Sequence, residues 1–492
     1  MVLSLHFPPS TSTDHLRLFR FVSPTGKNNK TDFQLPRRRF LPTSRTTKSP
    51  PLRAQSLPSA STIESFWQWL AKRDVVPSVN FEAVPEGMGL VAREDLGKGE
   101  LVVEVPKSLW INNDSVMASG IGSVCGGLKP WVSISLFLLT EKGKGIKSDW
   151  KPYLDILPEV TDSPLFWSEE DLLEIKGTQL LQTTLGLKEY IKFEFQRVEE
   201  DVILPNKHMF PSTFSLPDFF WAFGILRSRA FPRLGDYDLS LIPLADFINH
   251  GSGITTRYCP WEIGTKGIFS QKLFFSLKTP VYVKAGDQVF IQYDLDKSNA
   301  ELALDYGFIE NNPNRNTYTL TLEIAESDPF YDDKLDIAES NGMGKTAYFD
   351  IVLGQPLPTQ MLPYLRLAAL GGTDAFLLES IFRKPVWDHL ELPVSQSNEE
   401  FICKVIRKAC ESALSAHQTT IEQDERIMEQ GNLDPRLGIA VGIRIGEKKI
   451  LKMIDGIFQD RELELDILEY YQERRLKDLG LVGEQGEIIF WE

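Results

Sequence analysis

Segments that favour β-strands occur in two blocks that a long helical pattern separates. Residues 88–105 and 240–325 are rich in β-branched, aromatic and glycine residues arranged as short strands and turns. Between them, from 107 to 230, apolar residues recur at helical spacing. The strands expected from this pattern are 88–92, 100–105, 273–277, 288–292 and 318–322. We therefore predict one strand-rich unit that a helical insert splits in the sequence.

Signals for helix starts define the helices around and within this insert. Capping patterns predict helices that begin at Ser61 or Thr62, after Ser168 and after Ser215. Pro130 opens a further apolar run of helical type. The middle block is therefore expected to be an α-rich insert.

The C-terminal third carries a helical pattern of its own. After about residue 330 apolar residues again recur at helical spacing, and a capping box is expected at 397–400. A terminal helix is expected at about 463–476, where charged residues alternate with leucines. We predict a separate helical domain, and for the whole chain an α+β fold.

The N-terminal segment has a different composition from the rest. Residues 1–60 carry ten Lys or Arg but only two acidic residues, and they are rich in Ser, Thr and Pro. This composition is typical of an organelle transit peptide, and its hydroxylated, proline-containing character favours the plastid. The alternative is a disordered basic tail that binds an acidic partner. A secretory signal is disfavoured because no apolar region precedes a small-residue cleavage site.

The remaining chain is strongly acidic, with 43 basic and 66 acidic residues. Such a balance opposes binding to nucleic acid and to membrane surfaces, so we expect neither as a partner. No apolar run reaches the roughly 20 residues that a membrane-spanning helix needs. The four cysteines form no CxxC pair and the six histidines are scattered. We therefore expect no disulfide framework and no metal.

A glycine-rich sequence at Gly87 to Ala92 matches the pattern G-x-G-x-x-A of dinucleotide-binding proteins. A true fingerprint follows a strand and opens a helix. Here Pro85 and Glu86 precede it, and the later glycines with the strand at 100–105 indicate a hairpin. The oxidoreductase hypothesis is therefore disfavoured, and the glycines are expected to allow close approach of a ligand or a neighbouring strand.

Two polar residues end the apolar stretch 242–250. Asp246 lies within this stretch, and Asn249 and His250 close it. On its own, the segment is also compatible with a buried Asn–His pair that only satisfies main-chain groups. Its meaning depends on what surrounds it.

A second polar segment begins at Tyr293 and continues through 298–308. Together with 86–89 and 242–250, it resembles the SET-domain methyltransferases, specifically the branch whose SET domain is split. The sequence Leu362-Pro363-Tyr364-Leu365-Arg366-Leu367 adds a similarity to the Rubisco large-subunit lysine methyltransferases of plastids. The similarity runs from the first predicted helix to the C-terminus.

The resemblance implies a fold and a set of domains. The fold class would be α+β, with a β-rich SET core that contains a knot-like crossing, split by a helical insert and followed by an all-α substrate-binding domain. The segments would be 1–58 as plastid transit peptide, 59–106 and 231–325 as the two parts of the SET core, 107–230 as the insert, and 326–492 as the substrate-binding domain.

The resemblance also implies S-adenosylmethionine as the cofactor and a protein lysine as the methyl acceptor. Tyr293 and Tyr306 would be the catalytic residues. The cofactor-binding residues would be Glu86, Gly87, Met88, Arg229, Asn249 and His250. The substrate-binding residues would be Arg229, Arg233, Asp246, Trp261 and Tyr306.

Methyl transfer from a sulfonium to a lysine requires the protein mainly to position the two groups and to favour the neutral amine. The methyl group on a sulfonium is already electrophilic, so correct positioning carries most of the rate enhancement. The lysine must first lose a proton, from a reference pKa of about 10.4, and a dry aromatic channel next to a positive charge favours that loss. We therefore expect Tyr293 to orient the reacting groups rather than to act as a general base.

The predicted substrate depends on Cys259-Pro260-Trp261. The Rubisco-methylating members of the family carry a His-Ala-Tyr sequence there, and members that act on plastid fructose-bisphosphate aldolase resemble the Pro-Trp form. A substrate-side tyrosine is missing unless Tyr258 replaces it. Gly251 follows the Asn-His pair where Ser is common, a change that main-chain contacts tolerate. We expect aldolase as the substrate, Rubisco as a second possibility, and the chloroplast stroma as the location.

Two other functions share this fold. A related branch of split SET enzymes methylates histidine in actin, which import into a plastid would prevent. A SET scaffold without catalytic activity could bind a partner through its helical domain, but the presence of Tyr293, Tyr306 and the Asn249-His250 pair argues against it.

Overall fold

The computed structural model describes residues 57–75, 77–234, 237–255, 260–266, 272–379 and 386–481, with the side chains of 232–238 left undescribed. The predicted transit peptide, 1–58, lies outside these ranges except for its last two residues. The described chain forms two compact units. The strand-rich unit comprises 57–161 and Ile191–Leu295, and the helical unit comprises Asp162–Tyr190 and 296–481.

The central sheet of the strand-rich unit joins segments that lie before and after the predicted helical insert. Its order is β3 (Leu101–Pro106), β8 (Lys272–Lys278) and β7 (Trp261–Lys266), all antiparallel. Val103 and Val105 on β3 and Phe275 on β8 are fully buried, so apolar burial holds the two distant segments together. The predicted strand-rich unit split by an insert is confirmed, except that the strand expected at 318–322 belongs to the helical unit.

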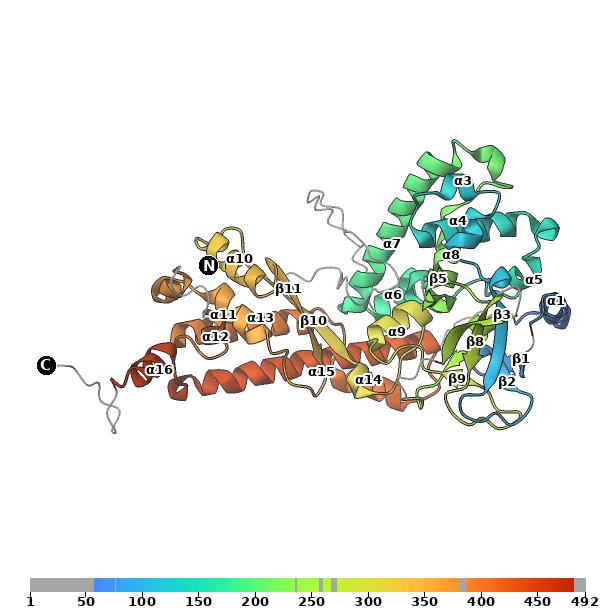
Figure 1. The fold of residues 1–492 in the computed structure, drawn as a ribbon. Coiled ribbons are helices and arrows are strands. Elements are labelled where there is room, and N and C mark those ends of the chain that lie inside the picture. Colours follow the sequence, from blue (N-terminus) through green and yellow to red (C-terminus); the bar gives the residue numbers. More distant parts are fainter. Residues whose placement is uncertain are drawn as a thin grey trace, which may run out of the picture. The chain divides into compact units, whose positions relative to one another are not determined.

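Smaller strand pairs surround this sheet. The pairs are β1 (Val79–Val84) with β2 (Gly87–Ala92), β4 (Phe231–Leu234) with β5 (Tyr237–Ser240), and β6 (Asn249–His250) in parallel with β9 (Phe290–Ile291). The sequence placed a strand at 288–292, and only its middle forms β9. In Figure 1 β1, β2 and β9 lie below the helices labelled α3, α4 and α8.

The expected hairpin between 88–92 and 100–105 is wrong, although both strands exist. β2 pairs with β1, a strand that was not predicted, and β3 pairs with β8. The turn that closes β1 and β2 is Pro85-Glu86, followed by Gly87 at φ +114°. Glycine adopts this backbone conformation without a steric penalty, which explains where the chain reverses.

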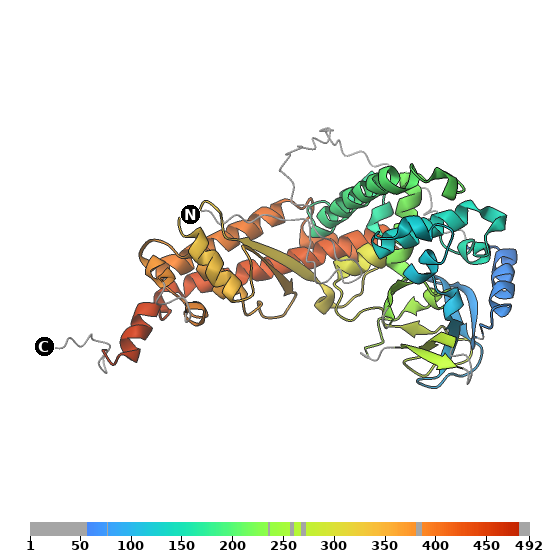
Figure 2. The ribbon, with the colours of Figure 1, turned by 45° about the horizontal axis from the view of Figure 1, so that its top comes forward.

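The helices of the strand-rich unit follow the predicted starts with one correction. α4 (Pro130–Gly143) begins at Pro130, and Ser215 caps α8 (Leu216–Arg229). The N-cap of α1 is Ser59 rather than Ser61 or Thr62, because its side chain accepts a hydrogen bond from the Thr62 N–H at 3.1 Å. α4 and α8 lie side by side in Figures 1 and 2. The helices are α1 (Ala60–Ala71), α2 (Asn113–Met117), α3 (Gly122–Cys125), α4, α5 (Lys151–Leu154) and α8.

The helical unit is built on the long helix α15 (Pro435–Leu463), with α13 (Gln396–Ser415) and α14 (Ile421–Glu429) packed along it (Figure 2). The capping box expected after Ser168 is present on the short helix α6 (Glu169–Glu174). Helix α7 (Gln179–Val198) begins in this unit and ends in the strand-rich unit. The other helices are α6 (Glu169–Glu174), α7 (Gln179–Val198), α9 (Asn299–Tyr306), α10 (Tyr331–Ser340), α11 (Met361–Ala369), α12 (Val386–Leu390) and α16 (Tyr471–Asp478).

Three expectations for the C-terminal region need correction. The predicted all-α domain also contains β11 (Thr346–Val352), which pairs with β10 (Thr317–Glu323). The buried residues of β11 alternate with more exposed ones along the strand, a period of two that the helical pattern around it obscured in the sequence. The N-cap of α13 is Ser395, so the capping box at 397–400 is wrong. The helix expected at 463–476 is interrupted, because α15 ends and α16 begins only at Tyr471.

Candidate active site

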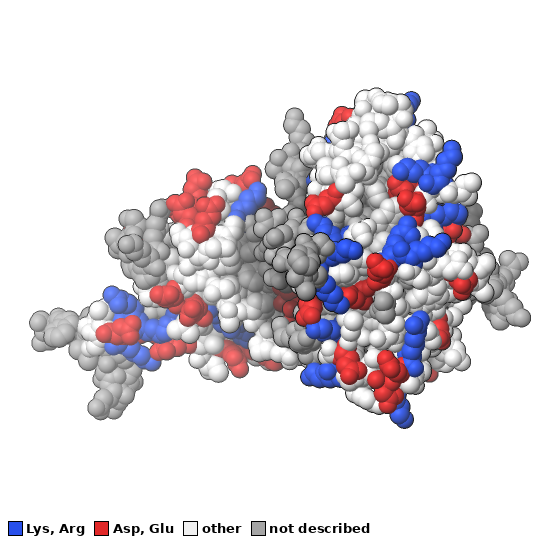
Figure 3. All heavy atoms as spheres, turned by 45° about the vertical axis from the view of Figure 1, so that its right-hand side comes forward, with Lys and Arg blue, Asp and Glu red and all other residues white. Residues whose placement is uncertain are grey.

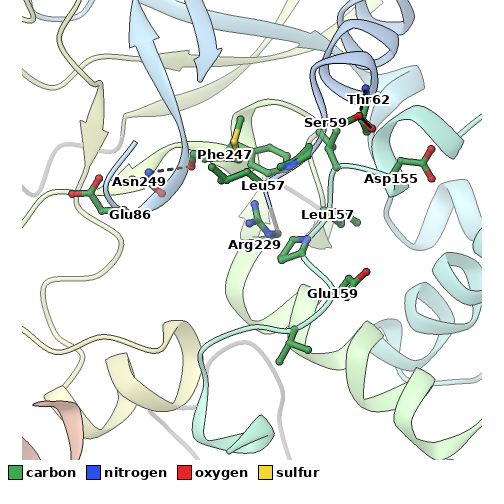
Figure 4. Close-up of a pocket in the computed structure, with 15 residues that line it drawn as sticks. Leu57, Ser59, Thr62, Glu86, Asp155, Leu157, Glu159, Arg229, Phe247 and Asn249 are labelled. Carbon is green, nitrogen blue, oxygen red and sulfur yellow. Dashed lines mark hydrogen bonds between the residues drawn. The ribbon is translucent and has the colours of Figure 1, made fainter. Parts of the chain in front are cut away.

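A pocket of about 530 Å³ opens in the strand-rich unit, and four of the residues predicted to bind the cofactor line it. Glu86 and Met88 come from the β1–β2 hairpin, Arg229 from the end of α8, and Asn249 from β6. Figure 4 shows Glu86 and Asn249 on one side, with Arg229 and Phe247 between them and the opposite wall. The rest of the wall is formed by Leu57, Pro58, Ser59, Thr62, Asp155, Ile156, Leu157, Pro158, Glu159, Val160 and Phe247.

Asn249 holds the hairpin against the second half of the core. Its Nδ2 donates to the main-chain oxygen of Met88 at 3.1 Å and to Oε1 of Gln288 at 3.0 Å. Gln288 in turn donates from Nε2 to Oε2 of Glu86 at 3.0 Å. This chain of hydrogen bonds fixes one end of the pocket, and Gln288 was not among the residues predicted to bind the cofactor.

Gly89 sits beneath this chain of hydrogen bonds. A Cβ at this position would lie 2.4 Å from Oε1 of Gln288 and 2.9 Å from Nδ2 of Asn249. The expected close approach to a neighbouring segment is therefore confirmed at Gly89. The dinucleotide interpretation fails, because Gly87–Ala92 is a strand of a hairpin rather than the start of a helix.

Arg229 is held by the segment that leads to Asn249. Its Nη1 donates to the main-chain oxygen of Asp246 at 3.0 Å, and its guanidinium lies 4.3 Å from the ring centroid of Phe247. Both contacts come from the short 3₁₀ turn Ala245–Phe247. They orient a positive charge on the pocket wall.

The Asp246 side chain is buried and does not line this pocket. Its Oδ2 accepts a hydrogen bond of 2.8 Å from the hydroxyl of Tyr153. Burial raises the pKa of Asp246 to about 6, although the Arg229 charge and the Tyr153 hydrogen bond act in the opposite direction. Asp246 was predicted as a substrate-side residue, and in the structure it contacts Arg229 through its main-chain oxygen, outside the residues that line this pocket.

Tyr293 lies directly against the Asn249-His250 strand. Its hydroxyl donates to the main-chain oxygen of Ile248 at 2.8 Å, and its N–H donates to Nδ1 of His250 at 3.2 Å. Burial raises the pKa of Tyr293 to about 12, and the Arg229 charge opposes this. The phenol is therefore protonated at neutral pH. His250 lines an adjoining pocket of about 620 Å³ together with Glu86 and Gln288.

The remaining predicted site residues lie elsewhere. Tyr306 ends α9 in the helical unit, where its ring stacks on Phe308 with centroids 5.9 Å apart. Trp261 begins β7 and packs edge-on against Phe231 at 5.3 Å. Arg233 belongs to β4, but its side chain lies outside the described part, as do residues 256–259.

Sequence reasoning missed two residues that organise the site. Gln288 stands at the start of a predicted strand, and only its contacts distinguish it from an ordinary strand residue. Tyr153 lies in the helical insert, with no motif around it, and is fully buried. Among the described residues, no group of three or more His, Cys, Asp or Glu side chains could hold a metal ion.

Comparison with known proteins gives three findings. Residues 325–451 match the family described as Rubisco LSMT substrate-binding. The chain is 63% identical to an Arabidopsis thaliana protein named [fructose-bisphosphate aldolase]-lysine N-methyltransferase, chloroplastic, over 90% of this chain and 92% of that protein. It is 64% identical to the chloroplastic Rubisco large-subunit N-methyltransferase of Nicotiana tabacum, over 87% of this chain and 88% of that protein.

A solved structure agrees with these relatives. The crystal structure of the SET domain of LSMT bound to lysine and AdoHcy superimposes with a TM-score of 0.82 at 59% identity. The match covers 87% of this chain and 98% of that chain. The predicted combination of a SET core with a C-terminal substrate-binding domain is therefore confirmed.

Proposed function

Because the chain belongs to the SET-domain lysine methyltransferase family of Rubisco LSMT, we propose that it methylates lysine side chains of chloroplast proteins, with fructose-bisphosphate aldolase as its main substrate. It is an S-adenosylmethionine-dependent protein-lysine N-methyltransferase. The observation that supports a cofactor site is that Glu86, Met88, Arg229 and Asn249 line one pocket.

The pocket suits S-adenosylmethionine in size and charge. About 530 Å³ lies within the usual range for small-molecule sites. The cofactor carries a carboxylate and an ammonium group, and the wall offers the Arg229 guanidinium and the Glu86 carboxylate. We propose that Arg229 pairs with the cofactor carboxylate, and that Glu86, Gly87, Met88, Asn249 and His250 hold the remainder. When bound, the cofactor supplies a methyl group on a positively charged sulfur.

Tyr293 is proposed as the residue that orients the reacting amine. A phenol with a pKa of about 12 cannot act as a general base at neutral pH. Its proton is committed to the main-chain oxygen of Ile248, so the lone pairs of the phenol oxygen remain available as acceptors. The amine would then lose its proton to water, and the buried setting favours its neutral form.

The other predicted roles remain proposals that the family relationship supports. We propose that Tyr306 forms part of the lysine channel and that Arg233 and Trp261 contact the substrate protein. For Asp246 the buried position supports an indirect role, through the main chain that binds Arg229. The boundary of the substrate-binding domain near 325 is supported by the family match, and we retain the five predicted segments as a proposal.

The choice of aldolase rests on Pro260-Trp261 rather than on overall similarity. Identities of 63% and 64% to the aldolase and Rubisco enzymes do not separate the two substrates. Trp261 lies at the start of β7, where its ring packs against Phe231. A Tyr at this position, as in the Rubisco-methylating members, would present a hydroxyl instead of an indole.

The partner is a protein, and the location is the chloroplast; the stroma is the proposed compartment. On the face visible in Figure 3, basic and acidic side chains lie close to one another, an arrangement that does not favour a phosphate backbone. Among the described residues, no helix is long and apolar enough to cross a bilayer.

The test is incubation of the purified enzyme with radiolabelled S-adenosylmethionine and either aldolase or Rubisco. We expect methyllysine on aldolase and weaker or no labelling of the Rubisco large subunit. Trp261→Tyr is expected to shift the ratio of labelling toward Rubisco. Methylhistidine in the product, or labelling of Rubisco alone, would contradict the proposal.

A further inference from the structure

The segment that leads to the pocket contains a main-chain conformation that L-residues rarely adopt. Leu244 has φ +73° and ψ −48°, and its side chain is fully buried. Such a conformation costs free energy and persists only where the surrounding structure holds it in place. The turn Ala245–Phe247 follows immediately, so the contacts of that turn help to hold this conformation in place.

One of the side chains that contact the turn is Tyr153. Tyr153 lies in the last turn of α5 and is fully buried. Its ring packs beside that of Phe66, with the ring centroids 6.4 Å apart. Its hydroxyl donates to Oδ2 of Asp246 at 2.8 Å, and Oδ1 of Asp246 has no hydrogen-bond partner among the described residues. Tyr153 is therefore the side-chain donor that stabilises the buried carboxylate.

Residues of the restrained segment hold several parts of the site. The main-chain oxygen of Asp246 accepts from Arg229, and the Phe247 ring lies under the same guanidinium. The oxygen of Ile248 accepts from Tyr293. A shift of this turn would therefore move the anchor points of Arg229 and Tyr293 together.

We propose that Tyr153 is a positioning residue for methyl transfer, which holds the segment 244–250 through Asp246 and thereby fixes Arg229 and Tyr293. The inference rests on the proposed function of the pocket. It extends that function, because it gives a role in the reaction to a residue of the helical insert that lies outside every motif of the SET core.

The charged and titratable groups that face Asp246 are Tyr153 from α5, Arg229 from α8 and Tyr293 from the segment after β9. With a pKa of about 6, the Asp246 carboxylate is ionised above that pH, and the Tyr153 hydroxyl then donates to a charged acceptor. Loss of the hydroxyl removes a group that favours the ionised form. The pKa of Asp246 is then expected to rise further.

The test compares Tyr153→Phe with the wild-type protein by calorimetric titration of S-adenosylmethionine and by initial rates between pH 5 and 8. The change removes only the hydroxyl. Because a hydrogen bond to a charged group is lost, we expect a dissociation constant raised about tenfold and a lower kcat. The midpoint of the acid limb of binding should also move to higher pH. A purely structural role would lower activity without moving this midpoint.

Tyr364→Phe is the matched control. Tyr364 is also fully buried and donates its hydroxyl, to the main-chain oxygen of Lys345 at 2.7 Å, but it belongs to the helical unit and lines neither pocket. Cofactor affinity and pH profile should be as in the wild type. The same profile in Tyr153→Phe as in this control would overturn the proposal.

Asp246→Asn keeps the inference testable should Tyr153→Phe fold poorly. The wild type is expected to lose cofactor affinity as pH falls through about 6, whereas Asp246→Asn should show no step there. A step of unchanged size in the variant would refute the role of this pair. Failure of the wild-type protein to bind S-adenosylmethionine would instead refute the proposed function, so the two outcomes are distinct.

Discussion

The hydroxyl of Tyr293 lies 2.8 Å from the main-chain oxygen of Ile248, one residue before Asn249. Tyr293→Phe removes this bond and the phenol oxygen but leaves the ring in place. We expect kcat to fall by roughly two to three orders of magnitude, since alignment of the amine is lost, while the dissociation constant of S-adenosylmethionine changes only a few-fold. Single-turnover rates and calorimetry measure the two effects. Normal turnover would show that the hydroxyl has no part in the reaction.

The same Tyr293 hydroxyl predicts a feature of the pH–rate profile. Because burial raises its pKa to about 12, Tyr293 stays protonated throughout the range in which the enzyme can be assayed. Below pH 10, the dependence of kcat on pH should therefore have the same shape in the wild type and in Tyr293→Phe. A limb that is present in the wild type and absent from the variant would show that the phenol loses its proton during catalysis.

Gly89 offers a test of the hydrogen-bond chain at the pocket. In Gly89→Ala the new Cβ would clash with Gln288 and Asn249, so both side chains must move and their mutual bond breaks. We expect cofactor affinity to fall at least tenfold, with a loss of about 1–3 kcal/mol in the free energy of unfolding. Gly264→Ala on β7 is the control, because a Cβ there meets nothing within 4 Å. Equal affinity in both variants would show that Gly89 is not needed.

The sequence predicted the architecture of the core better than its strand pairing. Apolar and β-branched runs predicted β3 and β8, and their residues Val103, Val105 and Phe275 are buried in the structure. Pairing was harder, since β2 lies between two glycine-containing turns, and either could have closed a hairpin. In the structure the turn at Gly87 closes the hairpin of β1 and β2, and β3 pairs instead with β8, more than 160 residues further along the chain. Such contacts leave no local signal.

Some residues of the candidate site could likewise be predicted from the sequence, and others could not. Arg229 and Asn249 could be named because they stand in segments that resemble a known family, and the structure brings both to one pocket. Tyr153 could not be named, because a buried tyrosine in a helical insert has the same local pattern as any core residue. Its partner Asp246 lies 93 positions further along the chain. Only the fold reveals their hydrogen bond.

A buried ion pair in the helical unit predicts a large effect on stability. Glu399 is fully buried and accepts from Nε of Arg366 at 2.6 Å and from Nε of Arg461 at 2.5 Å. Glu399→Gln would leave the buried Arg366 charge uncompensated, at a cost of about 3–5 kcal/mol in the free energy of unfolding. Arg407 is the control, because it pairs with Asp455 and Glu462 at the surface, where water screens the charges, so Arg407→Ala should lower the free energy of unfolding far less. Similar urea midpoints for the two variants would contradict this.

Glu447 predicts a pH dependence of stability in the same unit. Both of its carboxylate oxygens accept from the Gln179 N–H at 3.0 Å, yet burial raises its pKa to about 8 from an ordinary 4.5. The folded state therefore retains a proton that the unfolded chain releases. The free energy of unfolding should fall as pH rises from about 4.5 to about 8, by at most about 1.4 kcal/mol per pH unit.

Glu447→Gln separates this titration from all others in the chain. The amide oxygen can still accept from Gln179, but it cannot ionise, so the fall in stability between pH 6 and 8 should become smaller. Glu469→Gln is the control, because hydrogen bonding to Lys477 holds the pKa of that exposed carboxyl below its usual value, outside this pH range. Urea unfolding of the three proteins at pH 6 and 8.5 measures the slopes. If Glu447→Gln kept the wild-type slope, Glu447 would have to be ionised at pH 6 in the folded protein, and another buried group would have to account for the dependence.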